Sequence, residues 1–342
     1  MQKEIITKGN LLDETGRLKD AGWARSLIRT YQRERVHANH LRIKEWDYYL
    51  ITDGHRGLAL TIADNSYMGM YSVSWLDFDQ PAETTRSVMK PLTLGKTLLP
   101  STSKIGNVSY QDKQLQISFQ NDGSRRILTC TFPKFKDNKT LQAHVTLTNE
   151  PKESMVIMTP YKEDPDAFYY NQKINCMQAD GFVRLGTEYY YFNEDACGVL
   201  DWGRGVWTYA NTWYWSSASG YVDGHFFGFN LGYGFGDTSN ASENVLFYDG
   251  RIHKLGQIVF EIPQKDGKDD FLSPWKFTSN DNRFTCDFVP VIDRASCTNV
   301  GIIESDQHQV FGRFTGIAVL DDGTEIQLQD FFGFAEKVKN RW

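Results

Sequence analysis

The sequence predicts an all-β protein made of two antiparallel β-barrels or curved sheets packed in tandem, with few short helices. The first indication is the dipeptide Asp-Gly, which supplies the positive φ angles of tight hairpin turns and occurs seven times in the 342 residues. Helical periodicity, by contrast, is sparse. The length also exceeds the size at which a single hydrophobic core usually stops growing, so two domains are expected.

Strand-like runs flank several of the Asp-Gly pairs. Leu115–Phe119 and Ile127–Phe132 lie on either side of Asp122, as expected for a hairpin. The best helical candidates, residues 25–35 and 84–89, are short and weakly amphipathic. We therefore predict a meander of hairpins, with Asp-Gly pairs that begin at Asp53, Asp122, Asp180, Asp223, Asp249, Asp266 and Asp322.

The pattern loosens around residues 149–168, where three prolines alternate with charged residues. Prolines and polar clusters between periodic segments are typical of a connection. We therefore predict an N-terminal β domain over residues 1–154 and a C-terminal β domain over residues 155–342 that carries the functional site.

Charge and hydropathy exclude several classes of protein. The formal net charge is −6, and no cluster of five or more Lys or Arg residues could follow a phosphate backbone, so nucleic-acid binding is not expected. The first ten residues lack the apolar run of a secretory signal, and nowhere do about 18 apolar residues follow one another. We expect a cytoplasmic protein without an integral membrane segment.

The sequence contains no pattern of metal ligands and no cofactor-binding loop. The five cysteines are scattered without a CxxC spacing, and the seven histidines show no ligand spacing either. The glycine-rich string at residues 228–236 lacks the third-glycine spacing and the following helix of a dinucleotide-binding loop. We expect neither a metal nor a cofactor, and we interpret the cysteines as reduced thiols of the core.

Residues 225–236 alternate with period two, which on a strand sends successive side chains to opposite faces. Phenylalanine, leucine and tyrosine share one face, whereas the other carries glycines and a single amide, Asn230. Glycine in a strand marks a bend or a place where another group approaches the backbone. A coiled barrel strand and the wall of a binding site both fit this pattern.

An aromatic segment precedes this strand. It begins Asp201-Trp202-Gly203-Arg204-Gly205-Val206-Trp207 and holds four tryptophans within fourteen residues. Indole rings provide flat apolar walls, so a hydrophobic small-molecule ligand is the expected partner. The predicted ligand-binding residues are Trp202, Arg204, Trp207, Tyr209, Trp213, Trp215, Asn230 and Asn244.

Asp201 is the candidate catalytic acid. A carboxyl enclosed by indole rings loses hydration, so its pKa rises and it can stay protonated near neutral pH as a general acid. Arg204 would act in the opposite direction if it pairs with Asp201, but it could instead stack on a tryptophan or bind an acidic ligand group. Glu243 and His253 are further candidates for acid–base catalysis.

Three functions fit this site. The first is binding of a lipid or isoprenoid-like molecule in an aromatic barrel cavity, with acid-catalysed hydration or cyclisation by Asp201 as its enzymatic version. The second is a carbohydrate-active or carbohydrate-binding protein that stacks sugars on tryptophan and uses a carboxylate pair from Asp201, Asp237 and Glu243. The third is a non-catalytic structural β protein whose aromatics form a core around one buried ion pair.

The same residues resemble a known family. The segment 201–207, the strand Asn230-Leu231-Gly232, Glu243-Asn244 ahead of Asp249-Gly250, and the closing Gly333-Phe334-Ala335-Glu336 with Arg341-Trp342 are similar to the bacterial family called domain of unknown function 2804. The N-terminal Gly22-Trp23-Ala24-Arg25 and Lys44-Glu45-Trp46-Asp47-Tyr48 extend the resemblance over nearly the whole chain.

This family in turn resembles the AttH-like and carotenoid hydratase proteins. That resemblance implies a fold of two lipocalin-like β-barrels in tandem, and it implies an activity of the hydratase or terpene cyclase type. The distant relatives protonate an alkene with an aspartic acid inside an aromatic cavity. Asp201 is the residue of the matching kind in this sequence.

Overall fold

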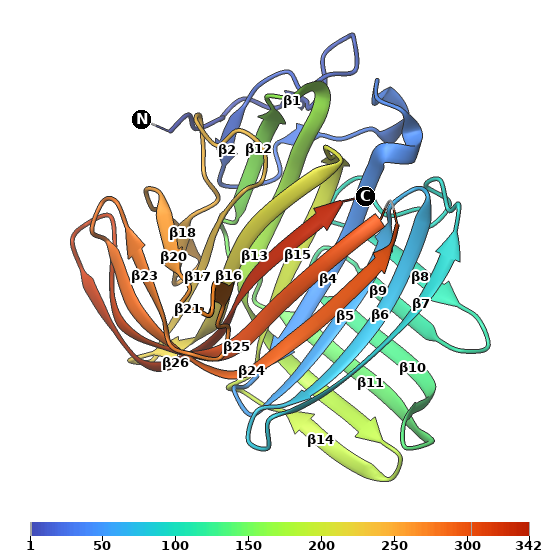
Figure 1. Cartoon of the computed structure of the whole chain (residues 1–342), viewed down its shortest axis with the longest axis vertical. Helices are drawn as coiled ribbons and strands as arrows, with labels where there is room; N and C mark the ends of the chain where they lie inside the picture. Colours follow the sequence, from blue (N-terminus) through green and yellow to red (C-terminus); the bar gives the residue numbers. More distant parts are fainter. Residues whose placement is uncertain (1, 302, 342) are drawn as a thin grey trace.

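Two curved antiparallel sheets make up most of the protein, and they pack against each other (Figure 1). The computed structural model describes residues 2–301 and 303–341. Trp342, the last residue of the C-terminal motif, lies outside the described residues. The predicted all-β class, with two lipocalin-like curved sheets in tandem and few short helices, is confirmed.

The first sheet contains thirteen strands within the described residues. Its main path runs β7-β6-β5-β4-β15-β13-β11-β10-β9-β8, while β2, β12 and β14 pair beside it. The strands are β2 (Gly22–Ala24), β4 (Ile43–Thr52), β5 (Arg56–Asp64), β6 (Met68–Asp77), β7 (Ala82–Pro91), β8 (Gly106–Gln111), β9 (Gln116–Asn121), β10 (Arg126–Lys136), β11 (Lys139–Thr148), β12 (Met155–Tyr161), β13 (Asp164–Leu185), β14 (Glu188–Phe192) and β15 (Cys197–Val206).

The second sheet has nine strands in the described part of the chain, in the order β19-β18-β17-β16-β26-β25-β24-β23-β20. They are β16 (Ala210–Val222), β17 (His225–Tyr233), β18 (Val245–Tyr248), β19 (Arg251–Lys254), β20 (Ile258–Glu261), β23 (Trp275–Ser279), β24 (Phe284–Val300), β25 (Ile303–Val319) and β26 (Glu325–Arg341). The small elements are β1 (Gly9–Asn10), β3 (Arg29–Thr30), β21 (Gln264–Lys265), β22 (Lys268–Asp269) and the 3-10 helices η1 (Arg33–Arg35) and η2 (His40–Arg42).

The Asp-Gly pairs form the expected turns with one exception. Six of them connect consecutive strands, and in each of the six the glycine has a positive φ angle. The pair at Asp180 instead lies inside the long strand β13. An added Cβ at Gly181 would overlap the carbonyl oxygen of His144 on the neighbouring β11, so this glycine permits close approach of two strands.

Two further expectations differ from the structure. Residues 84–89 lie within strand β7, and residues 25–35 contain only β3 and η1, because the sheet outweighs their weak helical periodicity. The proline-containing segment 149–168 forms β12 and the beginning of β13, both in the first sheet. The chain passes from the first sheet to the second between Val206 and Ala210.

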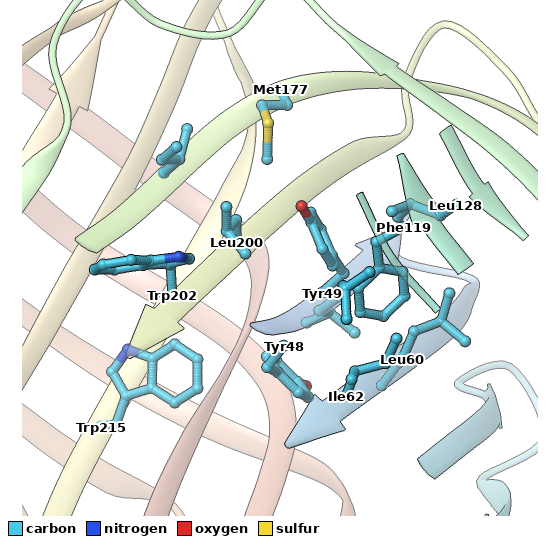
Figure 2. Packing of buried hydrophobic residues seen from close by; sticks show 14 of the residues in the cluster. Tyr48, Tyr49, Leu60, Ile62, Phe119, Leu128, Met177, Leu200, Trp202 and Trp215 are labelled. Carbon is cyan, nitrogen blue, oxygen red and sulfur yellow. The ribbon is translucent and has the colours of Figure 1, made fainter. Parts of the chain in front are cut away.

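Strand alternation gives β15, at the centre of the first sheet, two different faces. Trp202 and Arg204 lie on the face of β15 that points to the inner side of the curved first sheet. Figure 2 shows Tyr49 and Phe119 on the same side. Asp201 and Gly203 lie on the opposite face, which packs against the second sheet. This second face carries the polar groups described below.

Gly203 makes room for an indole ring on that face. A Cβ at Gly203 would overlap the ring of Trp46, which is held between Tyr169 and Trp207 with ring centroids 6.3 and 5.8 Å away. The glycine of this motif is therefore required by packing.

We expect Gly203→Ala to lower the free energy of unfolding by about 2–3 kcal/mol, because the Trp46 ring cannot move without disturbing its aromatic neighbours. Gly220→Ala is the matched control in β16, since its added Cβ would lie 3.1 Å from the edge of the Phe331 ring. The control should cost less than about 1 kcal/mol. Urea unfolding of both variants measures this, and equal losses would contradict the packing requirement.

Candidate functional site between the two sheets

Two cross-strand rows of side chains face each other between the sheets. On the first sheet, Lys173, Asp201 and Tyr48 are register partners on β13, β15 and β4, and we call them the Lys173 row. On the second sheet, Trp215, Glu336 and Gln309 are register partners on β16, β26 and β25, and we call them the Trp215 row. Side chains directly opposite on neighbouring strands share a face, so each row is a continuous surface.

The two rows contact each other directly. The Lys173 ammonium lies 3.8 Å from the centroid of the Trp215 ring, within range of a cation–π interaction. The Tyr48 ring meets the Trp215 ring edge to face at 5.9 Å (Figure 2), and its hydroxyl donates to Gln309 Oε1 at 3.4 Å. The sheets are thus joined by polar side chains as well as by apolar packing.

A buried ion pair forms the centre of the site. Lys173 Nζ lies 2.9 Å from Asp201 Oδ1, and the Asn171 amide donates to the same oxygen at 2.6 Å. Lys173 is 1% and Asp201 10% exposed at the side chain, so neither charge is compensated by bulk water. Both partners stabilise the carboxylate form of Asp201.

Glu243 reaches the same space from the loop between β17 and β18. Its backbone carbonyl accepts a hydrogen bond from Asn230 Nδ2, and the next residue, Asn244, accepts one from Gly232 N. An added Cβ at Gly232 would overlap Glu243 Oε1. The bare face of strand β17 is therefore the surface against which the Glu243 carboxyl lies.

The Glu243 carboxyl is fully buried and incompletely hydrogen-bonded. Tyr169 donates its hydroxyl to Oε2 at 3.4 Å, whereas Oε1 has no hydrogen-bond partner within the described residues. Burial raises the pKa of Glu243, although Lys173 acts in the opposite direction. Burial likewise raises the pKa of the Tyr169 hydroxyl, which therefore stays neutral and donates.

Glu336 is the second buried carboxyl with a raised pKa. It accepts hydrogen bonds from Trp213 Nε1 at 2.9 Å and from Gln309 Nε2 at 3.0 Å. Burial raises its pKa to about 7, against the lowering effects of the Trp213 bond and of Lys173. Lys173 thus influences both glutamates electrostatically while it pairs with Asp201.

Aromatic rings enclose these polar groups. The Trp207 ring lies 5.1 Å from Trp213, 5.5 Å from Tyr169 and 6.1 Å from Phe235, measured between centroids. Tyr169 in turn stacks on Phe235 at 4.9 Å. Four rings from both sheets and from the segment that joins them therefore cover the carboxyls, and they keep the local dielectric constant low.

The structure brings six of the predicted site residues together. They are Asp201, Glu243, Trp207, Trp213, Trp215 and Asn230. Asn230 accepts from Trp215 Nε1 at 2.7 Å and so links the tryptophan to the Glu243 backbone. The amide positions two predicted residues relative to each other.

Trp202 and Arg204 lie on the other face of β15. Arg204 pairs with Asp47 at 3.0 Å and stacks on the Trp202 ring at 4.2 Å, so it does not pair with Asp201. The reason is strand alternation, which separates positions 201 and 204 by face. A small pocket beside Asp47 and Arg126 has a volume of about 10 Å³, which is room for about one water molecule.

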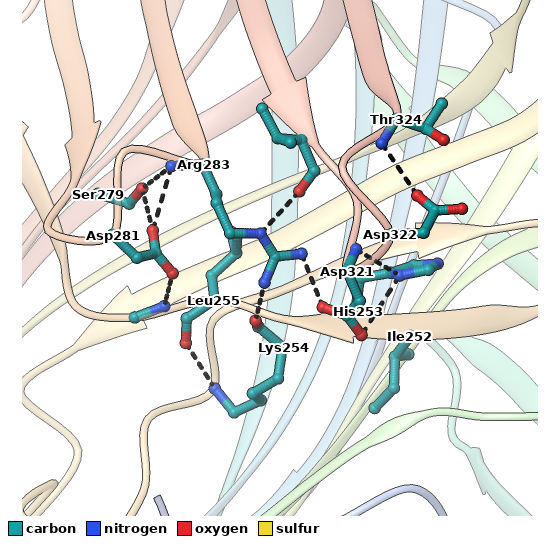
Figure 3. Close-up of polar contacts among 12 residues, drawn as sticks. Ile252, His253, Lys254, Leu255, Ser279, Asp281, Arg283, Asp321, Asp322 and Thr324 are labelled. Atoms are coloured by element: carbon teal, nitrogen blue, oxygen red, sulfur yellow. Dashed lines mark hydrogen bonds and ion pairs between the residues drawn. The ribbon is translucent and has the colours of Figure 1, made fainter. Parts of the chain in front are cut away.

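Three other predicted residues lie apart from the Lys173 row. Tyr209 is half-exposed beside an open surface depression, and Asn244 binds backbone groups of Gly232 and Gly256. His253 belongs to a separate surface network in which its Nδ1 accepts from the backbone N of Asp321 at 3.2 Å (Figure 3).

Sequence reasoning missed four polar members of the site, namely Lys173, Glu336, Asn171 and Gln309. The signal for two of them was an alternation of polar residues in an apolar strand: Asn171 and Lys173 are two residues apart and therefore share a face. The others become visible only through cross-strand register. Among the described residues, no group of three His, Cys, Asp or Glu side chains could hold a metal ion.

The fold and site define a protein of two tandem curved sheets with an aromatic, acid-containing cluster between them. The chain belongs to the family described as domain of unknown function 2804, whose match covers residues 2–342. No protein in the curated collection of characterised sequences matches it significantly. In the part of the chain that the structure describes, no helix is long and apolar enough to cross a membrane.

Solved structures share the fold at low sequence identity. A putative AttH from Nitrosomonas europaea is 10% identical with a TM-score of 0.55, and the match covers 90% of this chain and 95% of that one. Kievitone hydratase from Nectria haematococca is 10% identical with a TM-score of 0.50 and 98% coverage of both chains. CghA with Sch210972 is 9% identical with a TM-score of 0.51 and 97% coverage of both. This likeness extends to the fold alone.

We expect the raised pKa of Glu336 to make stability depend on pH. The folded value of about 7 lies above the ordinary 4.5, so the contribution is fully present below about pH 4.5 and is lost as the pH rises through 7. Between these pH values, Glu336 should cost the unsubstituted protein about 3 kcal/mol of unfolding free energy. The Glu336→Gln variant should not show this loss. Urea unfolding at a series of pH values measures it.

Glu325→Gln, an exposed position on the same strand, is the matched control. Its pH profile should follow that of the unsubstituted protein. A Glu336→Gln profile that is parallel to the control over the whole range would contradict a protonated Glu336 in the folded state.

Proposed function

We propose that the chain binds a neutral, largely apolar small molecule between its two sheets and that Glu243 protonates a carbon–carbon double bond of that molecule. The observation that carries the proposal is the Glu243 carboxyl. It is fully buried under aromatic rings, has a raised pKa, and has one oxygen with no hydrogen-bond partner among the described residues. A protonated carboxyl in such a setting is suited to general acid catalysis.

Glu243 suits the role of acid better than Asp201, to which the sequence assigned it. Asp201 already forms an ion pair with Lys173 and accepts a hydrogen bond from the Asn171 amide on the same oxygen. An anion near the reacting carbon would stabilise the positive charge that develops after protonation. The faces of Trp215 and Phe235, which already lie near the Lys173 ammonium, can contribute cation–π attraction.

The proposed reaction balances as an addition of water or as a ring closure. The double-bond electrons take the Glu243 proton, which forms a C–H bond and leaves a carbocation on the neighbouring carbon. In hydration, water supplies the new C–O bond and returns a proton to the Glu243 carboxylate. In cyclisation, a second double bond supplies the new C–C bond, and loss of a proton to Glu243 restores the acid.

The charge of the cluster favours an uncharged ligand. Among the described residues, the three carboxyls of Asp201, Glu243 and Glu336 have one ion-paired cation between them, Lys173, which pairs with Asp201. An anionic ligand group would add a fourth acid to a low-dielectric space and would have to be neutralised there. Hydroxyl groups, by contrast, could donate to Glu243 Oε1 and to Asn171 Oδ1, which has no partner among the described residues either.

We infer that a ligand reaches the acids past Trp207, whose ring lies 5.5 Å from that of Tyr169, the hydrogen-bond donor to Glu243. The segment between β15 and β16 borders an open depression of about 500 Å³ lined by Arg42, Glu163, Asp164, Thr208 and Tyr209. Arg42 closes one side of it, since it donates to the Trp207 carbonyl at 2.6 Å and pairs with Asp164 at 2.7 Å. Displacement of the Trp207 ring would open a path from this depression to Glu243.

No observation favours the carbohydrate alternative in the same way. Of its three carboxyls, Asp237 lies near the surface and pairs with Lys162 at 3.5 Å, whereas Asp201 and Glu243 are enclosed between the sheets. Glycoside hydrolysis requires two carboxyls that flank the scissile glycosidic bond, in a site that the sugar chain can enter.

We expect all-trans-retinol to bind at least about tenfold more tightly than all-trans-retinoate, since the two differ only in an uncharged versus an anionic end group. Quenching of tryptophan fluorescence on titration measures both dissociation constants. Equal affinities, or tighter binding of the acid, would refute the neutral-ligand part of the proposal.

We expect Glu243→Gln to keep retinol affinity within about twofold and to lower turnover at least about 100-fold, because the amide cannot donate a carboxyl proton. Turnover is followed by mass spectrometry on a panel of neutral terpenols beginning with geranylgeraniol, as a gain of one water mass or as a cyclic isomer. Asp237→Asn, six positions earlier in the same loop, is the control and should keep full activity.

The binding step and the catalytic step of the proposal are tested separately. If the native protein converts no member of the panel, the proposed acid catalysis is wrong. The retinol titration then still decides whether the protein binds a neutral apolar ligand. Equal turnover by Glu243→Gln and native protein would remove Glu243 from the role of acid.

A further inference from the structure

The connection between β7 and β8 displays large apolar side chains to solvent. Leu92 is 59% exposed, Leu94 44%, Leu98 78% and Ile105 59%. Single exposed hydrophobic residues are ordinary on protein surfaces, but four in one loop of fourteen residues, 92–105, form a concentrated patch. We call this connection the leucine loop.

The backbone of the leucine loop adopts an unfavourable conformation at these leucines. Leu92, Leu94 and Leu98 have φ angles of 53°, 50° and 55°, in the left-handed region that normally suits glycine or asparagine. Each such residue costs on the order of 1 kcal/mol or more relative to glycine. Leucine at three of these positions therefore indicates a role for the side chains on the surface.

Buried polar contacts hold the loop in place despite this strain. Asp64, which is fully buried, accepts hydrogen bonds from Thr93 Oγ1 at 2.8 Å, Gly95 N at 3.0 Å and Thr97 N at 3.3 Å. These bonds lower the pKa of Asp64 in spite of its burial, so the anchor stays charged.

The backbone of the exposed residues is also bonded to the sheet. Leu92 N donates to Tyr67 O at 2.8 Å, and Leu94 N donates to Ser66 O at 2.9 Å. Further along, Pro100 O accepts from Arg204 at 2.7 Å. The leucines are therefore presented on a fixed support, and their exposure is a property of the folded loop.

The charge around the loop differs from that of the whole chain. The chain has a formal net charge of −6, yet no Asp or Glu occurs between Glu83 and Asp112. Within that interval Arg86, Lys96 and Lys104 are exposed. The loop therefore combines exposed leucines with cations and contributes no carboxylate of its own, which is the composition that suits the interface of an anionic bilayer.

We propose that the leucine loop docks the protein reversibly on membranes that contain anionic phospholipids. The leucines insert among the lipid headgroups and upper acyl chains, while Lys96 and Lys104 pair with phosphate groups. The occupant of the surface is therefore a lipid bilayer, and this docking goes beyond the ligand chemistry of the site between the sheets.

The position of the loop connects it to the entrance described above. Register places the start of β4, the end of β5 and the end of β7 at one end of the first sheet, where Val206 at the end of β15 pairs with Ile43. The leucine loop leaves this end at Pro91, and the depression beside Tyr209 opens at the same end. A docked protein would thus hold its entrance near the source of apolar molecules.

The test is flotation of the purified full-length protein with vesicles, without added ligand. Native protein should float with phosphatidylcholine–phosphatidylglycerol vesicles more than with pure phosphatidylcholine, and added salt should weaken binding. Leu94→Ser with Leu98→Ser should weaken it by about tenfold per leucine. Lys96→Glu with Lys104→Glu should abolish the preference for anionic vesicles.

Leu272→Ser is the matched control, because Leu272 is 62% exposed and lies in the second-sheet region between β22 and β23. It should bind vesicles like the native protein, and thermal melts should confirm that all variants fold. Absence of native binding, or equal binding by the leucine double variant, overturns the proposal. A native dimer that the leucine double variant converts to a monomer in light scattering also overturns it, since the patch is then a subunit interface.

Vesicle flotation and the Glu243 experiments can fail independently. Flotation is measured without ligand and turnover without membrane, so a loss in one does not depend on the other.

Discussion

The ion pair between Lys173 and Asp201 is the interaction on which the arrangement between the sheets depends. Burying both charges costs several kcal/mol each, and the pair recovers this only through close geometry and added hydrogen bonds. Asn171 supplies one such bond and the Trp215 face supplies cation–π attraction, so both sheets contribute to the same compensation. The pair itself lies within the first sheet, and the contact of Lys173 with the Trp215 ring connects it to the second sheet.

Because Lys173 forms its ion pair with Asp201, the two neighbouring glutamates receive hydrogen bonds from neutral donors instead. Glu336 receives neutral donors from Trp213 and Gln309, and Glu243 receives one from Tyr169, and burial then favours their protonated forms. Among the described residues, Lys173 is the cation that forms an ion pair within this group of three carboxyls, and burial raises the pKa of the two glutamates. That division of protonation states is the pattern by which enzymes assign distinct roles to similar carboxyls.

Sequence alone predicted the fold class and most of the turns, since Asp-Gly chemistry and period-two alternation are local. It placed Asp201, Glu243 and four tryptophans in one site because these lie close in sequence, and three of the four tryptophans lie between the sheets with them. It could not reveal Lys173 or Glu336, which arrive through pairing of β13 with β15 and of β16 with β26. It left open whether Arg204 pairs with Asp201, stacks on a tryptophan or binds an acidic ligand group, and the alternation of faces along β15 places Arg204 against the Trp202 ring.

The glycines of the motif 201–207 and of strand β17 acquire a common explanation from this geometry. Gly203 admits the Trp46 ring on one sheet, and Gly232 admits the Glu243 carboxyl on the other. A side chain at Gly203 would displace the Trp46 ring within the first sheet, and one at Gly232 would displace the Glu243 carboxyl. A carboxyl displaced from the aromatic rings would meet water. Water would hydrate the charged forms and return their pKa values toward ordinary ones. The bare backbone at Gly232 is thus a physical condition for keeping the Glu243 carboxyl buried and its pKa raised.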